Sequence, residues 1–133
     1  MQQRLTQELL GFLSELPEKE RIEAINEFRI AIHSVSPFRE EPVDCVLWVE
    51  GNHITPNDYN PNNVAPPEKR LLLKSIEADG FTQPIVVVHS TEEEYEIIDG
   101  FHRHELGKSK PSLRSRLKGY LPITCLQRER HER

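Results

Sequence analysis

The feature that most constrains this chain is a set of four short apolar runs, each ended by turn-forming residues. They read "VDCVLWVE", "PIVVVHS", "YEIID" and "LPITCLQ". Runs of this length, rich in Val and Ile, predict β-strands rather than helices. The four runs fall between residues 43 and 127, so this part of the chain is expected to build a small sheet.

The segment "EKRLLLKSIEADG" before the second run has a helical pattern instead. Leu72, Leu73 and Ile76 fall on one helical face, and Gly80 can take the left-handed conformation that ends a helix. Because helix and strands alternate, we expect an α+β domain over residues 43–127. The long loop ahead of the helix, "HITPNDYNPNNVAPPE", is rich in Asn and Pro.

The first 36 residues predict two helices. Pro17 followed by Glu18 is typical of a new first helical turn, so it divides the segment into two helices. Apolar residues recur at helical spacing on both sides of this break: Leu5, Leu9, Leu10, Leu13, Leu16, Ile22, Ile25, Phe28 and Ile32. We therefore expect a helical hairpin or elbow over 1–36, a linker with two prolines, the domain at 43–127 and a polar tail at 128–133.

Composition limits the function classes. The 133 residues carry a net charge of -5, with 36% hydrophobic residues, which predicts a polar protein without a general attraction to nucleic acid or to anionic membranes. There is no long apolar run at the N-terminus, so a cytoplasmic protein is the default expectation. Cys45 and Cys125 lie far apart in strand-like runs, which favours buried thiols over a disulfide.

The junction "YEIIDGFHRHELGK" concentrates ionisable groups where a strand meets a helix. A helix that begins after Asp99 and Gly100 exposes its first backbone N–H groups, and the helix dipole adds partial positive charge there. Gly100 lets an anion approach the backbone, and Arg103 supplies a fork suited to phosphate oxygens. Phe101 and His102 complete the turn. The sequence therefore predicts a phosphate site at Gly100–Arg103.

An ordinary junction is the alternative, with Asp99 as helix cap and polar side chains on a solvated face. His102 and His104 are two residues apart and fall on different helical faces, so we expect no shared metal and name no metal ligands. His53 and His89 show no recognisable partner in the sequence.

In order and spacing, the segments "ITPNDYNPN", "LLLKSIEADGFTQPIVVV" and "YEIIDGFHRHELGK" resemble the ParB and sulfiredoxin superfamily. Partition proteins of the ParB type have a Gly-Glu-Arg-Arg turn, and sulfiredoxins a Gly-Cys-His-Arg turn, where this chain has Gly100, Phe101, His102 and Arg103. The likeness covers about residues 43–125 and is greatest to the IbrB-like branch of prophage-associated co-activators. It implies a ParB/sulfiredoxin-like small mixed sheet with helices.

The resemblance also implies a function. Phe101 replaces the sulfiredoxin cysteine, so sulfiredoxin chemistry is not expected. The free-serine kinases of the superfamily place a carboxylate where this chain has Asp58, which would then accept a proton from a hydroxyl or water. His102 would act as a phosphate donor or second acid. We expect a nucleotide, ATP or CTP, with Mg²⁺, held by Asp99, Gly100, Phe101, His102, Arg103 and Gln83.

Two other readings stay open. The first is a non-enzymatic regulator of transcription of the IbrB type, for which the resemblance implies a PAPS-reductase-like protein partner. The leucine-rich N-terminal helices are expected to offer a homodimer or partner surface. The second concerns DNA: the basic stretch "KSKPSLRSRLK" predicts weak, sequence-independent binding at most, unless its cations balance the acidic turn "TEEE" or line the nucleotide site.

Overall fold

The computed structural model describes residues 2–56 and 66–127. Contacts within the chain divide it into two compact units, Met1–Cys45 and Val46–Arg133. Asp58 and the tail 128–133 lie outside the described residues. No helix in the described residues is both long and apolar enough to span a bilayer.

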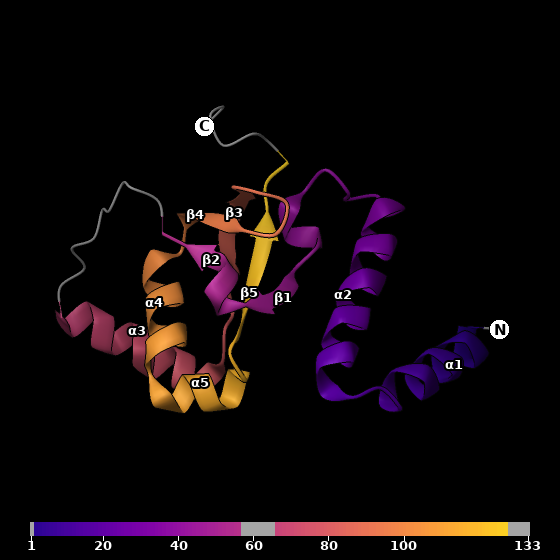
Figure 1. Ribbon diagram of the computed structural model, residues 1–133, viewed down its shortest axis with the longest axis horizontal. Coiled ribbons are helices and arrows are strands. Elements are labelled where there is room, and N and C mark those ends of the chain that lie inside the picture. Colours follow the sequence, from indigo (N-terminus) through magenta and orange to yellow (C-terminus); the bar gives the residue numbers. More distant parts are fainter. Residues whose placement is uncertain (1, 57–65, 128–133) are drawn as a thin grey trace. The chain divides into compact units, whose positions relative to one another are not determined.

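The first unit consists of two α-helices and a short 3-10 turn, whose bounds are α1 (Gln2–Ser14), α2 (Glu18–Ser34) and η1 (Pro42–Asp44). Pro17 precedes the first turn of α2, which carries Glu18 and Glu20 near the positive end of the helix dipole. The two expected helices are thus confirmed. The two helices diverge from their short connection like the arms of a V (Figure 1). Of the two arrangements expected, this is the elbow and not a hairpin with the helices packed side by side.

The first unit has no buried core: of its described residues, 2–45, none is buried. The rings of Phe12 and Phe28 meet edge to face, with centroids 6.3 Å apart, and join the two arms. Apolar residues at helical spacing from this contact lie on the same faces of the two helices. We call this set the V surface: Leu5, Leu9, Phe12, Phe28, Ile32 and Val35.

The second unit is built from a five-stranded sheet and three helices. In chain order they are β1 (Leu47–Glu50), η2 (Gly51–His53), β2 (Ile54–Thr55), α3 (Pro66–Asp79), β3 (Ile85–His89), β4 (Tyr95–Asp99), α4 (Phe101–Ser109), α5 (Pro111–Leu117) and β5 (Tyr120–Cys125). The strand order is β1-β5-β3-β4-β2. Strand β5 pairs antiparallel with β1 and parallel with β3, and β4 pairs antiparallel with β3 and parallel with β2. The expected small mixed sheet is confirmed.

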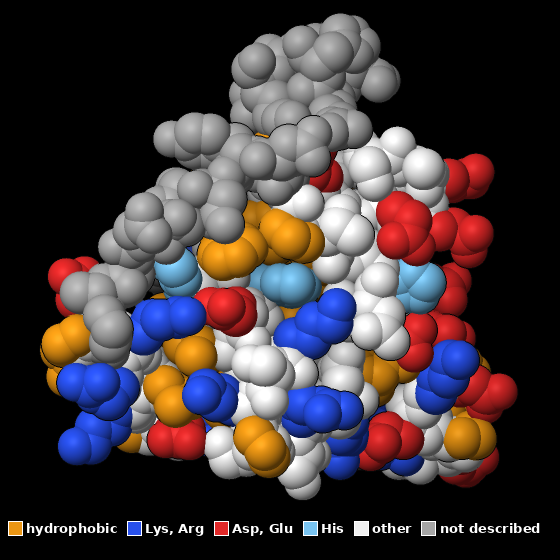
Figure 2. Space-filling view, turned by 60° about the vertical axis from the view of Figure 1, so that its left-hand side comes forward, with side chains coloured by type: hydrophobic (Ala, Val, Ile, Leu, Met, Phe, Trp, Pro, Cys, Tyr) orange, Lys and Arg blue, Asp and Glu red, His pale blue; other side chains and the backbone are white. Residues whose placement is uncertain are grey.

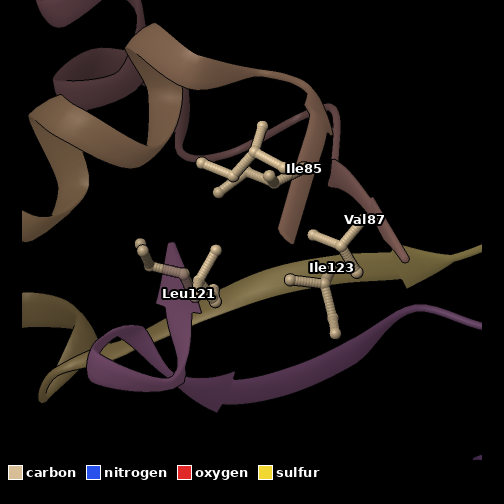
Figure 3. Close-up of a cluster of buried hydrophobic side chains, with 6 residues drawn as sticks. Ile85, Val87, Leu121 and Ile123 are labelled. Carbon is tan, nitrogen blue, oxygen red and sulfur yellow. The ribbon is translucent and has the colours of Figure 1, made fainter. Parts of the chain in front are cut away.

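Alternate residues of β3 and β5 face the core, although β5 is buried on both faces over Leu121–Thr124. One apolar cluster lies on the sheet, where Ile85, Val87 and Ile123 are fully buried and Leu121 nearly so (Figure 3). A second cluster joins the three helices through Ile76, Leu106 and Leu113. Phe81 and Leu117 contact both clusters. The helices are therefore fixed to the sheet through a continuous apolar interior.

Most expected elements of the second unit are present, with three corrections. The segment "HITPNDYNPNNVAPPE", expected to be a loop, contains strand β2 at Ile54–Thr55 and the start of helix α3 at Pro66. The helix ending at Gly80 is confirmed: this glycine has φ +82°, and its N–H donates to the Ile76 carbonyl at 2.8 Å. The run "VDCVLWVE" is a strand only from Leu47, because Pro42–Asp44 forms a 3-10 turn. The basic stretch contains a helix, α5, which we did not predict. Pro111 starts this helix, and Leu113 is buried beneath it.

The two cysteines form no disulfide and are both half-buried. Burial raises the pKa of the Cys45 thiol and of the Cys125 thiol. Both therefore stay protonated at neutral pH, as poorly reactive thiols.

Candidate functional site: the helix N-terminus after strand β4

A single residue in the left-handed backbone conformation, Gly100, connects strand β4 to helix α4. Gly100 has φ 101° and ψ 24°, a conformation that costs a residue with a side chain about 1 kcal/mol or more. Its carbonyl accepts the first intrahelical hydrogen bond, from His104 N at 3.0 Å. Gly100 is thus the N-cap residue. Asp99 comes one position too early to cap the helix, which removes the role given to it in the alternative reading.

The first turn of α4 is open to an anion. No side chain makes a capping hydrogen bond to this turn, and it contains no acidic residue. The N–H groups of the first helical residues have no intrahelical acceptor, and the helix dipole places partial positive charge beside them. This end of the helix therefore presents donors and positive potential.

Arg103 lies close over this turn. A Cβ placed on Gly100 would lie 3.1 Å from Arg103 Nη2 and 3.3 Å from Ile85 Cα. The guanidinium therefore lies against the glycine at the start of the helix. Arg103 Nε is buried and has no hydrogen-bond partner among the described residues. A buried donor left without an acceptor is costly, so an acceptor that reaches this atom would be favoured.

The start of strand β3 borders the same turn. Ile85 opens β3 and approaches Gly100 as described above. Gln83 is exposed and stands two residues ahead of Ile85, so it belongs to the segment that leads into this contact. The structure brings the chain around Gln83 and the turn into one neighbourhood, although they are seventeen or more residues apart in sequence.

His102 faces Glu105 and, through it, helix α3. His102 Nδ1 lies 3.8 Å from Glu105 Oε1, which is too long for a hydrogen bond, and Lys69 Nζ lies 2.8 Å from the same oxygen. The hydrogen bond from Lys69 is the main reason that the pKa of Glu105 falls below its usual value. This carboxylate is thus compensated by Lys69, and histidine and basic side chains lie near one another on this side of the molecule (Figure 2).

His104 points to the interior and serves the fold. It is 5% exposed, and burial lowers the pKa of its imidazole. The backbone at Gly51 and Ile54 partly offsets this lowering of the pKa, and His104 Nε2 is buried without a hydrogen-bond partner among the described residues. His102 and His104 therefore have different surroundings, as expected from their spacing.

His53 has two carboxylate partners, neither of which was recognisable in the sequence. His53 Nδ1 lies 2.7 Å from Glu94 Oε2, and Nε2 lies 3.4 Å from Glu50 Oε2. The hydrogen bond with Glu94 is the largest cause of a raised pKa for this imidazole. Glu94 is 41 residues away, so no local sequence signal reveals the pair.

His89 is also engaged, contrary to our expectation. Its Nδ1 lies 3.1 Å from the Thr91 carbonyl oxygen, and its ring centroid lies 4.7 Å from that of Tyr95. Both contacts fall on the β3–β4 hairpin. These two contacts give His89 a structural role in the hairpin.

The basic stretch is divided between structure and surface. Arg116 donates to the carbonyls of Ile76 and Glu77 at 2.8 and 3.1 Å, so it joins α5 to the end of α3. Lys108 and Arg114 line a pocket of about 340 Å³. Glu94 of the acidic turn pairs with His53. From the sequence, the basic stretch was considered as the partner of this turn.

The described residues do not form a magnesium site by themselves. They contain no group of three His, Cys, Asp or Glu side chains arranged to hold a metal. Asp99 is the acidic residue directly before the turn, and one carboxylate is too few without other ligands. Asp58 is outside the described residues, so its role stays a prediction.

The fold defines a small α+β domain of a known class. Residues 38–110 match the family model described as the ParB N-terminal domain. The chain belongs to this family. The IbrB-like branch stays a prediction.

The comparisons also include a curated relative. The chain is 70% identical over all of its 133 residues to YbdM of Escherichia coli (strain K12). It spans 64% of the length of that relative.

Among solved structures, sulfiredoxin from Arabidopsis thaliana superposes with a TM-score of 0.50 at 16% identity, over 65% of this chain and 90% of that one. This likeness shows the fold. C-terminally truncated ParB from Caulobacter crescentus, complexed with CTP-γ-S, has a TM-score of 0.48 at 21% identity, over 65% of this chain and 46% of that one.

Proposed function

We propose that this protein binds a nucleotide and holds its phosphates at the turn Gly100–Arg103. One observation carries the proposal: α4 begins without a side-chain cap, behind a left-handed glycine, and Arg103 lies against that glycine with a buried Nε that has no partner among the described residues. Membership of the ParB N-terminal domain family supports it.

Three groups would act together on a phosphate. Backbone N–H groups of the first helical turn would donate to its oxygens, and the dipole would favour its negative charge. Arg103 would add charge-assisted hydrogen bonds, which are about twice as strong as neutral ones. A Cβ at position 100 would crowd Arg103 Nη2, so glycine leaves room for the guanidinium and the ligand.

Neighbouring residues would select the rest of the ligand. Gln83, on the segment entering β3, would face a base or a ribose. His102 would donate to a phosphate or exchange a proton, because an imidazole can serve both roles. The described residues give no set of magnesium ligands, so a metal ion would have to take its ligands largely from phosphates and water.

Calorimetric titration of the full chain with ATP and with CTP tests the proposal. CTP is included because the Caulobacter structure contains its analogue. Arg103→Ala should weaken affinity about tenfold or more, because a hydrogen bond to a charged group contributes about 1.5–3 kcal/mol. Arg114→Ala, an exposed arginine of α5, is the matched control and should leave affinity unchanged. Equal affinity of Arg103→Ala and the wild type would remove the phosphates from this turn.

A second candidate is a non-enzymatic module that binds a partner, favoured by the exposed V surface. Measuring phosphate release from the nucleotide distinguishes an enzyme from such a non-enzymatic module. If the protein is a hydrolase or phosphotransferase, Asp58→Asn should abolish turnover and spare binding, because the amide cannot take a proton. If the wild type binds a nucleotide and never turns it over, the regulatory reading replaces the enzymatic one.

A further inference from the structure

The first unit exposes far more apolar surface than the second. Ten large apolar side chains are exposed among the described residues, and nine of them belong to the first unit. The tenth, Leu71, lies on α3. Scattered exposed apolar residues are ordinary on a monomer, whereas such a concentration on 45 residues marks an interaction surface.

The exposure follows the geometry of the V. On α2 the exposed fraction rises with distance from the ring contact, from 38% at Phe28 to 63% at Ile32 and 79% at Val35. On α1, Phe12 is 53% exposed at the ring contact, Leu9 is half-buried, and Leu5 is 59% exposed at the far end of the same face. Apolar side chains therefore stay largely uncovered toward the open end of the V.

The V is held in this shape before any partner binds. Arg21 Nη2 donates to the carbonyls of Ser14 and Leu16 at 3.2 and 2.9 Å, which satisfies acceptors at the C-terminal end of α1. The edge-to-face contact between Phe12 and Phe28 holds the two helices together on their facing sides. A surface organised in advance loses little conformational freedom on association.

We propose that the V surface is the docking site for a second copy of this chain, with the two V surfaces facing each other across a two-fold axis. Ile25, Phe28, Ile32 and Val35 are spaced three, four and three residues apart, which is the spacing of a seam between associating helices. A two-fold contact places this seam against itself.

Charge and area suit this occupant. Helix α2 carries both acidic and basic residues, as in "EKERIEAINEFR", so two copies do not meet with a single sign of charge. A stable interface takes about 800 Å² from each partner, of which about 60% is apolar. With roughly 150–200 Å² for each fully exposed large apolar residue, the V surface offers on the order of 500 Å².

Sedimentation velocity of the full chain without nucleotide tests the proposal. The wild type should sediment as a dimer at micromolar concentration. Ile32→Glu should weaken association about tenfold or more, because it buries a charge in the seam. Leu71→Glu, the same change at the exposed apolar residue of the second unit, should dimerise as the wild type does.

If circular dichroism shows that Ile32→Glu has lost helix content, Val35→Asp serves as the second variant that tests the dimer. Val35 is the C-cap residue of α2 and is 79% exposed, so its replacement does not disturb packing within the monomer. It too should weaken the dimer. A wild type that stays monomeric at about 100 µM, or V-surface variants that dimerise as the wild type does, would overturn the proposal. So would association lost equally in Leu71→Glu. Nucleotide binding is measured separately and does not depend on these outcomes.

Discussion

The two units of this chain solve the problem of burial in opposite ways. The second unit encloses its apolar residues: Ile85, Val87 and Ile123 are fully buried between the sheet and its helices. The first unit, within its described residues 2–45, buries none. Because burial of apolar surface supplies most of the stability of a fold, the second unit carries its own stability and can support a ligand site. The first unit leaves most of its large apolar side chains exposed instead.

The largest expected effect comes from the same isoleucine-to-alanine substitution made in each unit. Ile123→Ala should lower the free energy of unfolding by about 2–5 kcal/mol, because it leaves a cavity in the sheet core. Ile32→Ala should lower it by less than about 1 kcal/mol, since this side chain is 63% exposed. Urea unfolding at low protein concentration measures both. Similar losses from the two variants would contradict a coreless first unit.

Two helix-interior glycines sharpen the contrast at a smaller scale. A Cβ on Gly107 in α4 would lie 2.5 Å from Leu121 Cδ2, whereas a Cβ on Gly11 in α1 would meet nothing within 4 Å. Gly107→Ala should destabilise the protein by about 1–2 kcal/mol, as crowding outweighs the better helix propensity. Gly11→Ala should stabilise it by up to about 1 kcal/mol. The thermal midpoints give the signs, and a stabilised Gly107→Ala would show that α4 packs loosely.

The units also differ in their response to acid. Burial lowers the pKa of His104, so protonation favours the unfolded chain, and stability falls as the pH drops below about 6.5, by at most about 1.4 kcal/mol per pH unit. In the first unit, the hydrogen bond from His33 lowers the pKa of Asp44, whose contribution is lost only at pH values below about 4. The raised pKa of His53 acts in the other direction, because its contribution is retained in acid.

Urea midpoints at pH 7.5 and 5.5 check this order. The wild type should be less stable at pH 5.5. His104→Gln should show a smaller difference between the two pH values, since the amide does not titrate. A difference of the same size in His104→Gln would assign the acid response to other groups.

The sequence predicts what depends on local pattern. The helix end at Gly80 and the strands "PIVVVHS" and "YEIID" rest on periodicity and turn residues, and the structure confirms them. The turn after Asp99 follows from the same reasoning, because a glycine between a strand and a helix start is a local signal. What these signals do not contain is the position of Arg103 Nη2 over Gly100, which depends on side-chain packing.

The misses have a common cause in contacts distant along the chain. Helix α5 has two apolar residues within a basic stretch, and it is stabilised by burial of Leu113 and by Arg116 bonding to the end of α3, about forty residues away. The partner of His53 is likewise 41 residues distant. Such contacts become visible only once the sheet order is known. The carboxylate chosen by resemblance, Asp58, lies outside the described residues and stays a prediction.

The most direct test of the central claim locates the bound phosphates on the second unit. The chain has a mass of 15.5 kDa, which suits amide-resolved NMR. Titration of ¹⁵N-labelled protein with ATP or CTP should shift the backbone amides of Phe101, His102 and Arg103 most, because these are the uncapped donors of α4. Amides around the basic pocket at Lys108 and Arg114 should move little. Saturable binding that leaves the α4 amides unshifted, or the absence of binding by either nucleotide at millimolar concentration, would contradict the account.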